Sequence, residues 1–181
     1  MESAFELLRI AGIEPESIVD GPGIRFTLFT QGCPHHCPGC HNPETHDFNG
    51  GHFITVEEIL RMIGDNPLLD GVTFSGGDPF VQARQLIPLA REIKERGLHL
   101  TIFTGYLYEK LIELGKTERP EFLELLSFAD ILVDGPFILA LRSLELQFRG
   151  SMNQRLIDVQ KTLFDNPSGE IVLWKSKFED L

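Results

Sequence analysis

Short apolar runs alternate with segments of helical periodicity along most of the chain. Six of these runs are rich in Ile, Val, Leu, Phe or Thr and have the length of strands. They cover residues 24–30, 72–75, 98–104, 131–134, 144–148 and 171–174. Alternation of strands and helices is typical of an α/β fold with a parallel sheet. Because six strands are too few for a closed eight-stranded barrel, the pattern predicts a partial barrel or an open sheet.

The segments between these runs carry helix start and stop signals. A capping box is expected where Thr55 acts as the N-cap and Glu58 reaches back to it. A second helix is expected to begin near Gln85, which places Pro88 in its first turn, and to end at Gly97 in a left-handed cap. Three further helices are predicted over residues 106–114, 120–127 and 151–164.

Length and charge exclude several classes of protein. A chain of 181 residues is expected to form a single domain, residues 1–181. Its formal net charge of −11 repels phosphate backbones, so nucleic acid is not an expected partner. No apolar run approaches the roughly 20 residues that span a membrane, and the N-terminal residues lack the pattern of a signal peptide. Together with reduced cysteines, this composition predicts a cytoplasmic protein with no membrane partner.

All three cysteines of the chain, Cys33, Cys37 and Cys40, lie within eight residues. An odd number of cysteines in one short loop is typical of a soft-metal centre rather than of disulfides. Four thiolates normally hold a four-iron cluster, so three would leave one iron open to a substrate or a cofactor. The spacing leaves one alternative open, a Cys3His zinc site in which His41 is the fourth ligand.

A second candidate motif, Ser75-Gly76-Gly77-Asp78, ends the predicted strand at residues 72–75. Paired glycines let a ligand approach the backbone closely, and the aspartate adds an acceptor suited to an ammonium group. The same residues also fit a tight turn that binds nothing. Because chemistry in such folds gathers beyond the C-terminal ends of the strands, this turn and the cysteine loop are expected to share one site.

Together these motifs resemble those of the radical S-adenosylmethionine enzymes. Residues 19–45, VDGPGIRFTLFTQGCPHHCPGCHNPET, are similar to the activating enzymes of glycyl-radical proteins. Two subgroups compete, the pyruvate formate-lyase activases and the activating proteins of anaerobic ribonucleoside-triphosphate reductase. The second subgroup is the more similar, because of the short length and the motifs SGGDPF, FTGY, ILVDGPF and RGSMNQ. The resemblance runs from about residue 17 to about residue 160.

The resemblance implies a partial (β/α)6-type barrel with a mostly parallel sheet, and two cofactors. Cys33, Cys37 and Cys40 would bind a [4Fe–4S] cluster, whose remaining iron would take the amino and carboxylate groups of S-adenosylmethionine. Many radical enzymes carry an aromatic residue in place of Gly39, so stacking on the adenine would fall to another group. A β-branched residue at position 77 is expected to impair cofactor binding more than cluster assembly. The residues that the resemblance assigns to the cofactor are Gly39, Cys40, His41, Ser75, Gly76, Gly77, Asp78, Thr104, Asp134, Gly150 and Asn153.

Several of these assignments have an ordinary structural alternative. Asp134 would contact ribose or an ion, or it would simply begin a turn. Residues 146–153 are the nearest match to the G-x-I-x-G-x-x-E pattern of the family, in which Gly150 fits and Asn153 replaces the glutamate. Ser151 in this segment would instead cap the following helix. Among the other histidines, His35 and His36 are expected to face solvent or the partner, and His46, His52 and His99 to be surface or half-buried residues.

The implied function is the activation of anaerobic ribonucleoside-triphosphate reductase. S-adenosylmethionine would be cleaved reductively and a hydrogen atom taken from a glycine of the reductase, which leaves a glycyl radical. The implied partners are the large subunit of that reductase and an electron donor such as flavodoxin. Three alternatives remain: activation of another glycyl-radical enzyme such as pyruvate formate-lyase, a non-enzymatic iron–sulfur electron carrier, and a zinc-stabilised interaction module. A fourth cysteine would have favoured the electron carrier, and the chain has none.

Overall fold

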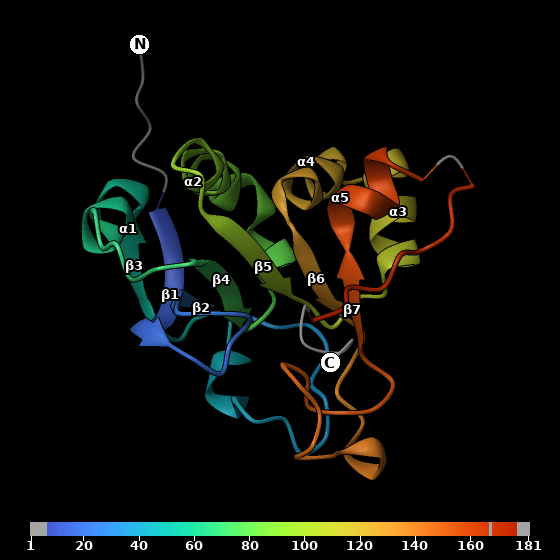
Figure 1. The fold of residues 1–181 in the computed structure, drawn as a ribbon. Helices are drawn as coiled ribbons and strands as arrows, with labels where there is room; N and C mark the ends of the chain where they lie inside the picture. The colour runs from blue at the N-terminus through green and yellow to red at the C-terminus, as the bar shows by residue number, and fades with distance from the viewer. Residues whose placement is uncertain (1–6, 167, 177–181) are drawn as a thin grey trace.

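The computed structural model describes residues 7–166 and 168–176, which form a mixed α/β fold (Figure 1). Its strands are β1 (Leu7–Ser17), β2 (Arg25–Thr30), β3 (His52–Thr55), β4 (Gly71–Gly76), β5 (His99–Phe103), β6 (Ile131–Asp134) and β7 (Arg155–Asp158). Within the described residues these seven strands form one sheet, in the order β3-β1-β2-β4-β5-β6-β7. The α/β class predicted from the sequence is therefore confirmed.

The four central strands, β2, β4, β5 and β6, run parallel, whereas β1, β3 and β7 pair antiparallel with their neighbours. Phe26 lies beside Val72 and Thr30 beside Gly76, so the C-terminal ends of β2 and β4 are level. Among these pairings three are parallel and three are antiparallel, so the expected mostly parallel sheet is limited to the centre. The parallel centre brings four strand ends to one edge of the sheet.

In the part of the chain that the structure describes, five α-helices lie along one side of the sheet (Figure 1). They are α1 (Val56–Ile63), α2 (Ala83–Glu95), α3 (Tyr108–Thr117), α4 (Pro120–Phe128) and α5 (Val159–Phe164). The main hydrophobic core joins strand residues such as Phe26, Phe74 and Ile102 to helix residues such as Leu89 and Leu125. Side chains alternate across a strand, so every second residue of the central strands reaches this core. Within the described residues, no helix is long and apolar enough to cross a membrane.

The residues between these core positions include buried polar side chains. Arg25 is 0% exposed and donates from Nε to the Thr73 hydroxyl at 3.1 Å and from Nη2 to the His99 carbonyl at 3.0 Å. Burial lowers the pKa of its guanidinium to about 10. A second, smaller apolar cluster on β6 and β7 includes Val133 and Leu156. The helices thus cover one face of the sheet, and the other face is built from hydrogen-bonded polar groups and a small cluster.

Four of the six predicted strands are confirmed, because residues 24–30, 72–75, 98–104 and 131–134 correspond to β2, β4, β5 and β6. The strand predicted at residues 144–148 is wrong, since that segment forms bends and turns. The strand predicted at residues 171–174 is also wrong, although Leu173 makes one isolated bridge to Ile157. The prediction missed β1, β3 and β7, which are the outer strands of the sheet, β3 and β1 on one flank and β7 on the other.

The predicted helix signals near the N-terminus of α1 are confirmed. The backbone N–H of Glu58 donates to the Thr55 hydroxyl at 3.1 Å, and the Thr55 N–H donates to the Glu58 carboxylate at 3.0 Å. Gly97, after α2, has the expected left-handed φ of +73°. Helix α2 begins at Ala83 because a 3-10 turn leads directly into it, so Pro88 lies inside the helix rather than in its first turn.

The helix predicted over residues 151–164 is wrong in its first half. Residues 155–158 form β7, whose Ile157 pairs with Leu132 of β6. Helix α5 begins only at Val159, where Asp158 is the N-cap and accepts from the Lys161 N–H at 3.0 Å. The other two predicted helices, at residues 106–114 and 120–127, correspond to α3 and α4. Pairing with β6 therefore overrides the helical periodicity of this segment.

Candidate cofactor site

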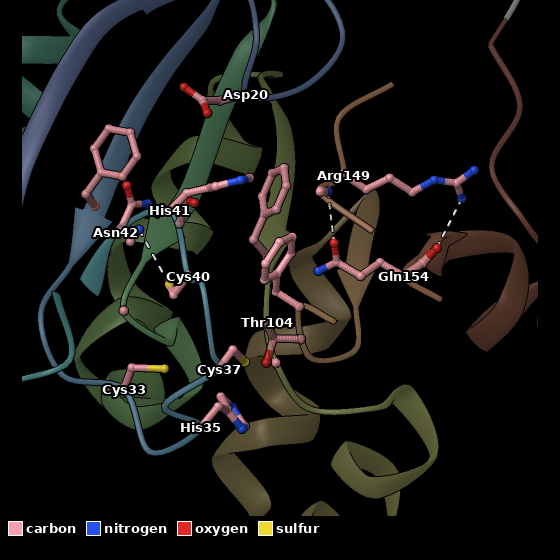
Figure 2. A pocket seen from close by; sticks show the side chains of 18 of the residues that line it. Asp20, Cys33, His35, Cys37, Cys40, His41, Asn42, Thr104, Arg149 and Gln154 are labelled. Carbon is pink, nitrogen blue, oxygen red and sulfur yellow. Dashed lines mark hydrogen bonds between the residues drawn. The ribbon is translucent and has the colours of Figure 1, made fainter. Parts of the chain in front are cut away.

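A cavity of about 660 Å³ lies where the C-terminal ends of the four parallel strands meet. Figure 2 shows Cys33, Cys37 and Cys40 on one side of it, with Arg149 and Gln154 toward the other side. Nine of the residues that the sequence assigned to the cluster or the cofactor line the cavity. They are Cys33, Cys37, Cys40, His41, Ser75, Gly76, Gly77, Thr104 and Gly150. The structure thus brings the cysteine loop and the glycine turn to one place.

The cysteine loop follows β2 directly and is held by backbone hydrogen bonds. The Gly32 N–H donates to the Thr45 carbonyl at 2.8 Å, and the Cys33 N–H donates to the His46 carbonyl at 3.2 Å. Between the other two cysteines, the Cys40 N–H donates to the Cys37 carbonyl at 3.1 Å. The loop therefore has a defined shape that fixes where each thiol leaves the backbone.

The donor set fits an iron–sulfur cluster better than a single metal ion. Among the described residues, no three His, Cys, Asp or Glu side chains are grouped tightly enough to hold one ion. A four-iron cluster takes each thiolate on a different iron, which needs thiols spread around a cavity. Burial raises the pKa of the Cys33 thiol to about 11, and metal binding would offset that preference for the protonated form. The Asn42 N–H lies 3.4 Å from the Cys40 sulfur, in the manner of hydrogen bonds that tune cluster sulfurs.

The glycine turn after β4 packs directly against the start of the cysteine loop. A Cβ on Gly77 would lie 2.3 Å from the Gly32 carbonyl oxygen, and a Cβ on Gly76 would lie 2.6 Å from the Thr30 nitrogen. Gly76 also has a φ of +92°, which an L side chain rarely adopts. The Gly77 N–H donates to the Thr30 carbonyl at 2.7 Å. These glycines are therefore required by chain packing, in addition to any approach of a ligand.

Asp78 has partners other than the ammonium group expected from the sequence. Its side chain is 0% exposed and is absent from the cavity wall. One carboxylate oxygen accepts from the Phe80 N–H at 3.0 Å, and the other accepts from the Thr104 hydroxyl at 2.8 Å and the Gly105 N–H at 3.0 Å. Nε2 of His35 lies 2.6 Å from that second oxygen. Asp78 thus binds the turn after β4, the end of β5 and the cysteine loop, although its side chain does not line the cavity.

Three other predicted residues lie outside the cavity wall. Asp134 is 0% exposed and is bound by the Arg155 guanidinium, and it accepts from the Tyr108 N–H at 2.8 Å at the start of α3. Asn153 donates to the Pro136 carbonyl at 2.8 Å. The third, Gly39, has a φ of +74° and shapes the loop between two cysteines.

The far wall of the cavity comes from the segments around β6 and β7. The Gly150 and Ser151 N–H groups donate to the Gln154 side-chain oxygen at 2.9 and 3.1 Å, and the Gln154 amide donates to the Gly135 carbonyl at 3.1 Å. Ser151 does not cap a helix as its alternative assignment proposed, because its hydroxyl accepts from the Ile138 N–H at 3.2 Å. Gln154 therefore holds the two segments of this wall together.

Sequence reasoning missed several cavity residues that carry aromatic, charged or amide groups. The Phe137 ring lies 5.0 Å from the exposed His41 ring, between the cysteine loop and Gly150. The other missed residues include Asp20, Phe29, His35, Phe103, Phe148, Arg149 and Gln154. Most of them lie inside quoted motifs such as VDGPG, ILVDGPF and RGSMNQ. The motifs indicated the segments, but nothing in the residue types showed which side chains face inward.

A protein-family model described as "4Fe-4S single cluster domain" matches residues 19–157. The chain is also similar to the anaerobic ribonucleoside-triphosphate reductase-activating protein of Escherichia coli K12, with 35% identity over 148 residues that cover 77% of this chain and 92% of that protein. The protein of the same name from Enterobacteria phage T4 is 33% identical over 150 residues, covering 80% of this chain and 90% of the phage protein.

The pyruvate formate-lyase-activating enzyme of Clostridium pasteurianum is 44% identical over 114 residues. That match covers 60% of this chain and 48% of the enzyme, so the chain spans about half the length of this relative. A solved structure, QueE from Escherichia coli, superposes with a TM-score of 0.43 at 20% identity, over 55% of this chain and 52% of QueE. That structural likeness is too low to support a conclusion, whereas the sequence matches extend over most of the chain.

Proposed function

Because the chain belongs to the family of radical S-adenosylmethionine activating enzymes of glycyl-radical proteins, we propose that it activates an anaerobic ribonucleoside-triphosphate reductase. The observation that carries this proposal is the match to relatives of that name over 92% of their length in Escherichia coli and 90% in phage T4. The cavity supports it, because three thiols and a glycine turn meet at the ends of four parallel strands.

The enzyme uses a [4Fe–4S] cluster and S-adenosylmethionine. When bound, these cofactors supply a reductive cleavage of the sulfonium that ends in hydrogen abstraction from a glycine of the protein substrate. We assign Cys33, Cys37 and Cys40 to the cluster, because all three line the cavity and no cysteine remains elsewhere in the chain. We assign the backbone of Ser75–Gly77 to the methionyl end of S-adenosylmethionine, since these residues line the cavity between the cysteine loop and Thr104.

The adenine end is assigned to the opposite part of the cavity. His41 and Phe137 place two rings 5.0 Å apart there, and a Cβ on Gly150 would lie 3.0 Å from the Phe137 ring. The flat face of a base can stack on such rings, and a residue without a side chain leaves room for it. The cavity reaches the surface at Val19, which lines it and is 71% exposed, so a glycine-bearing loop has a route inward.

The finer features of the fold and setting belong to the same proposal. A partial (β/α)6-type barrel is supported by a sheet whose edge strands, β3 and β7, do not pair with each other. Helices lie along one side of this sheet, and the cavity lies at the C-terminal ends of its parallel strands. The single sheet supports one radical S-adenosylmethionine domain over residues 1–181. Three free thiols in a cavity need a reducing compartment, which supports the cytoplasm. A flavodoxin-like donor would supply the electron.

One observation favours a second candidate substrate. The 44% identity to the pyruvate formate-lyase-activating enzyme of Clostridium pasteurianum is higher than the identity to the reductase activators, although it covers less of either chain. A glycyl-radical enzyme of the pyruvate formate-lyase type is therefore the alternative to test beside the reductase.

The test is anaerobic incubation of the reconstituted protein with S-adenosylmethionine, a reductant and either candidate substrate. Electron paramagnetic resonance should show a glycyl radical on the reductase, and reductase with deuterated glycines should transfer deuterium into 5′-deoxyadenosine. A radical that forms only on pyruvate formate-lyase would transfer the assignment to that enzyme. Deuterium transfer from neither protein would overturn the activase proposal.

A further inference from the structure

His35, between the first two cysteines, points into the protein instead of toward solvent or a partner as the sequence suggested. Its side chain is 17% exposed, whereas its neighbours Pro34 and His36 are exposed. Nε2 of its ring lies 2.6 Å from the Asp78 carboxylate. A histidine in a loop of cluster ligands is thus bound to the motif that follows the glycine turn.

The carboxylate of Asp78 collects donors from three separate segments. The Phe80 N–H comes from its own turn, the Thr104 hydroxyl and the Gly105 N–H come from the end of β5, and His35 comes from the cysteine loop. The carboxylate is 0% exposed, so each of these contacts replaces water. A hydrogen bond to a charged, buried group is stronger than one at the surface, and leaving such a group short of donors is costly.

The space around the His35 ring is shaped to hold it in this position. A Cβ on Gly105 would lie 2.4 Å from Cδ2 of the ring, so only glycine leaves room for it. Gly105 has no positive φ, which means that its backbone conformation does not itself require glycine. The Tyr106 ring meets the imidazole edge-on, with 4.6 Å between ring centroids. The residues at the end of β5 therefore leave space for the His35 ring, and they also donate to the carboxylate that binds it.

A second connection fixes the loop on the other side of the first cysteine. The Asp78 N–H donates to the Gly32 carbonyl at 2.9 Å, immediately before Cys33. Gly32 is thus bound to the backbone of Asp78, and His35 is bound to the side chain of Asp78. Cys33 lies between these two points.

We propose that His35 is a positioning residue that fixes the cysteine loop to the ends of β4 and β5 through Asp78. The inference rests on the proposed function, in which the loop holds the cluster and the glycine turn holds S-adenosylmethionine. The spacing between cluster and cofactor is then set by one buried carboxylate. Loss of the His35 contact should weaken cofactor binding and alter how the cofactor perturbs the cluster, while iron is still bound by the three cysteines.

Three variants of the full chain test this role. His35→Phe keeps a ring but loses the donor, and His35→Gln keeps a donor at a similar reach. His36→Asn is the control, because His36 is an exposed neighbour whose φ of +47° suits asparagine. We expect His35→Phe to bind iron to within about twofold of the parent protein, and to raise the Kd for S-adenosylmethionine about tenfold, in line with a lost hydrogen bond to a charged group.

The spectroscopic readout separates positioning from general stability. Adding S-adenosylmethionine should shift the electron paramagnetic resonance spectrum of the reduced cluster in the parent, in His36→Asn and in His35→Gln, and shift it less in His35→Phe. Gly105→Ala should act like His35→Phe, because its methyl group would displace the ring. In a His35→Ala background, Gly105→Ala should cause no further loss.

Amide hydrogen exchange on the metal-free protein provides a test that does not depend on the cofactors. Peptides covering residues 33–40 should exchange faster in His35→Phe than in His36→Asn. Parent-like cofactor affinity, spectrum and exchange in His35→Phe would overturn the positioning role. If the parent protein itself binds no cluster or S-adenosylmethionine, the proposed function fails, and the exchange comparison still decides whether His35 fixes the loop.

Discussion

Replacing Gly77 with alanine should disturb the cysteine loop as well as the cofactor turn. From the sequence, a β-branched residue at this position is expected to impair cofactor binding more than cluster assembly. In the structure a Cβ here would lie 2.3 Å from the Gly32 oxygen and 2.8 Å from its carbonyl carbon. Because Gly77 has no positive φ, the alanine backbone is unstrained and the effect comes from this collision. The collision falls on the residue that precedes Cys33.

The size of the effect follows from the contacts that must move. Two non-bonded carbon atoms are unstrained from about 3.5 Å outward. The glycine turn and the start of the cysteine loop must therefore separate by about 1 Å. Overpacking of this kind costs about 1–3 kcal/mol. The separation also stretches the hydrogen bonds from the Gly77 N–H to Thr30 and from the Asp78 N–H to Gly32, which are 2.7 and 2.9 Å long. Each contributes about 1 kcal/mol when fully formed, and stretching removes about half of that, so we expect Gly77→Ala to lose roughly 2–4 kcal/mol of unfolding free energy. A domain of ordinary stability, about 5–15 kcal/mol, would remain folded.

Urea unfolding of the metal-free protein measures this loss directly. The matched control is Gly12→Ala, since a Cβ on Gly12 meets nothing within 4 Å and Gly12 has no positive φ. The control should change the unfolding free energy by less than about 0.5 kcal/mol. After anaerobic reconstitution, Gly77→Ala should hold less iron per chain and bind S-adenosylmethionine more weakly than the control. If Gly77→Ala unfolds like the control and retains full iron, the turn does not support the cysteine loop as the structure indicates.

Three further predictions concern other parts of the molecule. Arg155→Ala should destabilise the fold by about 3–5 kcal/mol in urea unfolding, because it leaves the fully buried Asp134 carboxylate without its cation, and a loss below about 1 kcal/mol would contradict this. Burial lowers the pKa of His99 to about 4 from 6.5, so its stabilising contribution is complete above pH 6.5 and is lost as the pH falls toward 4. The urea midpoint of the parent should therefore fall more steeply over that window than that of His99→Gln, and parallel curves would be inconsistent with a half-buried imidazole that is held neutral. Cys37→Ala should lose both the iron and the activity, and a fully active protein that carries zinc and no iron would rule out the cluster.

The sequence was informative about the centre of the sheet because local patterns describe it well. Strands β2, β4, β5 and β6 are short apolar runs buried on both faces, which is how central parallel strands are recognised. In β1, Leu8 and Ile10 are buried while Leu7 is 51% exposed, so apolar residues on both faces hide the alternation. In β7, Leu156 and Ile157 continue into Val159 at helical spacing, and only pairing with β6 makes them a strand.

By itself the sequence determined the cysteine spacing, the glycine turn and the family that both motifs indicate, because these are properties of neighbouring residues. Tertiary structure alone decided which groups donate hydrogen bonds to each buried carboxylate. His35 and Asp78 are 43 positions apart, and Arg155 and Asp134 are 21 apart, yet each pair is in direct contact. A buried carboxylate must find donors wherever the fold brings them, so its partners depend on the packing of distant segments. For this reason the sequence could assign Asp78 to the site only as a prediction, and its four donors became visible only in the folded chain.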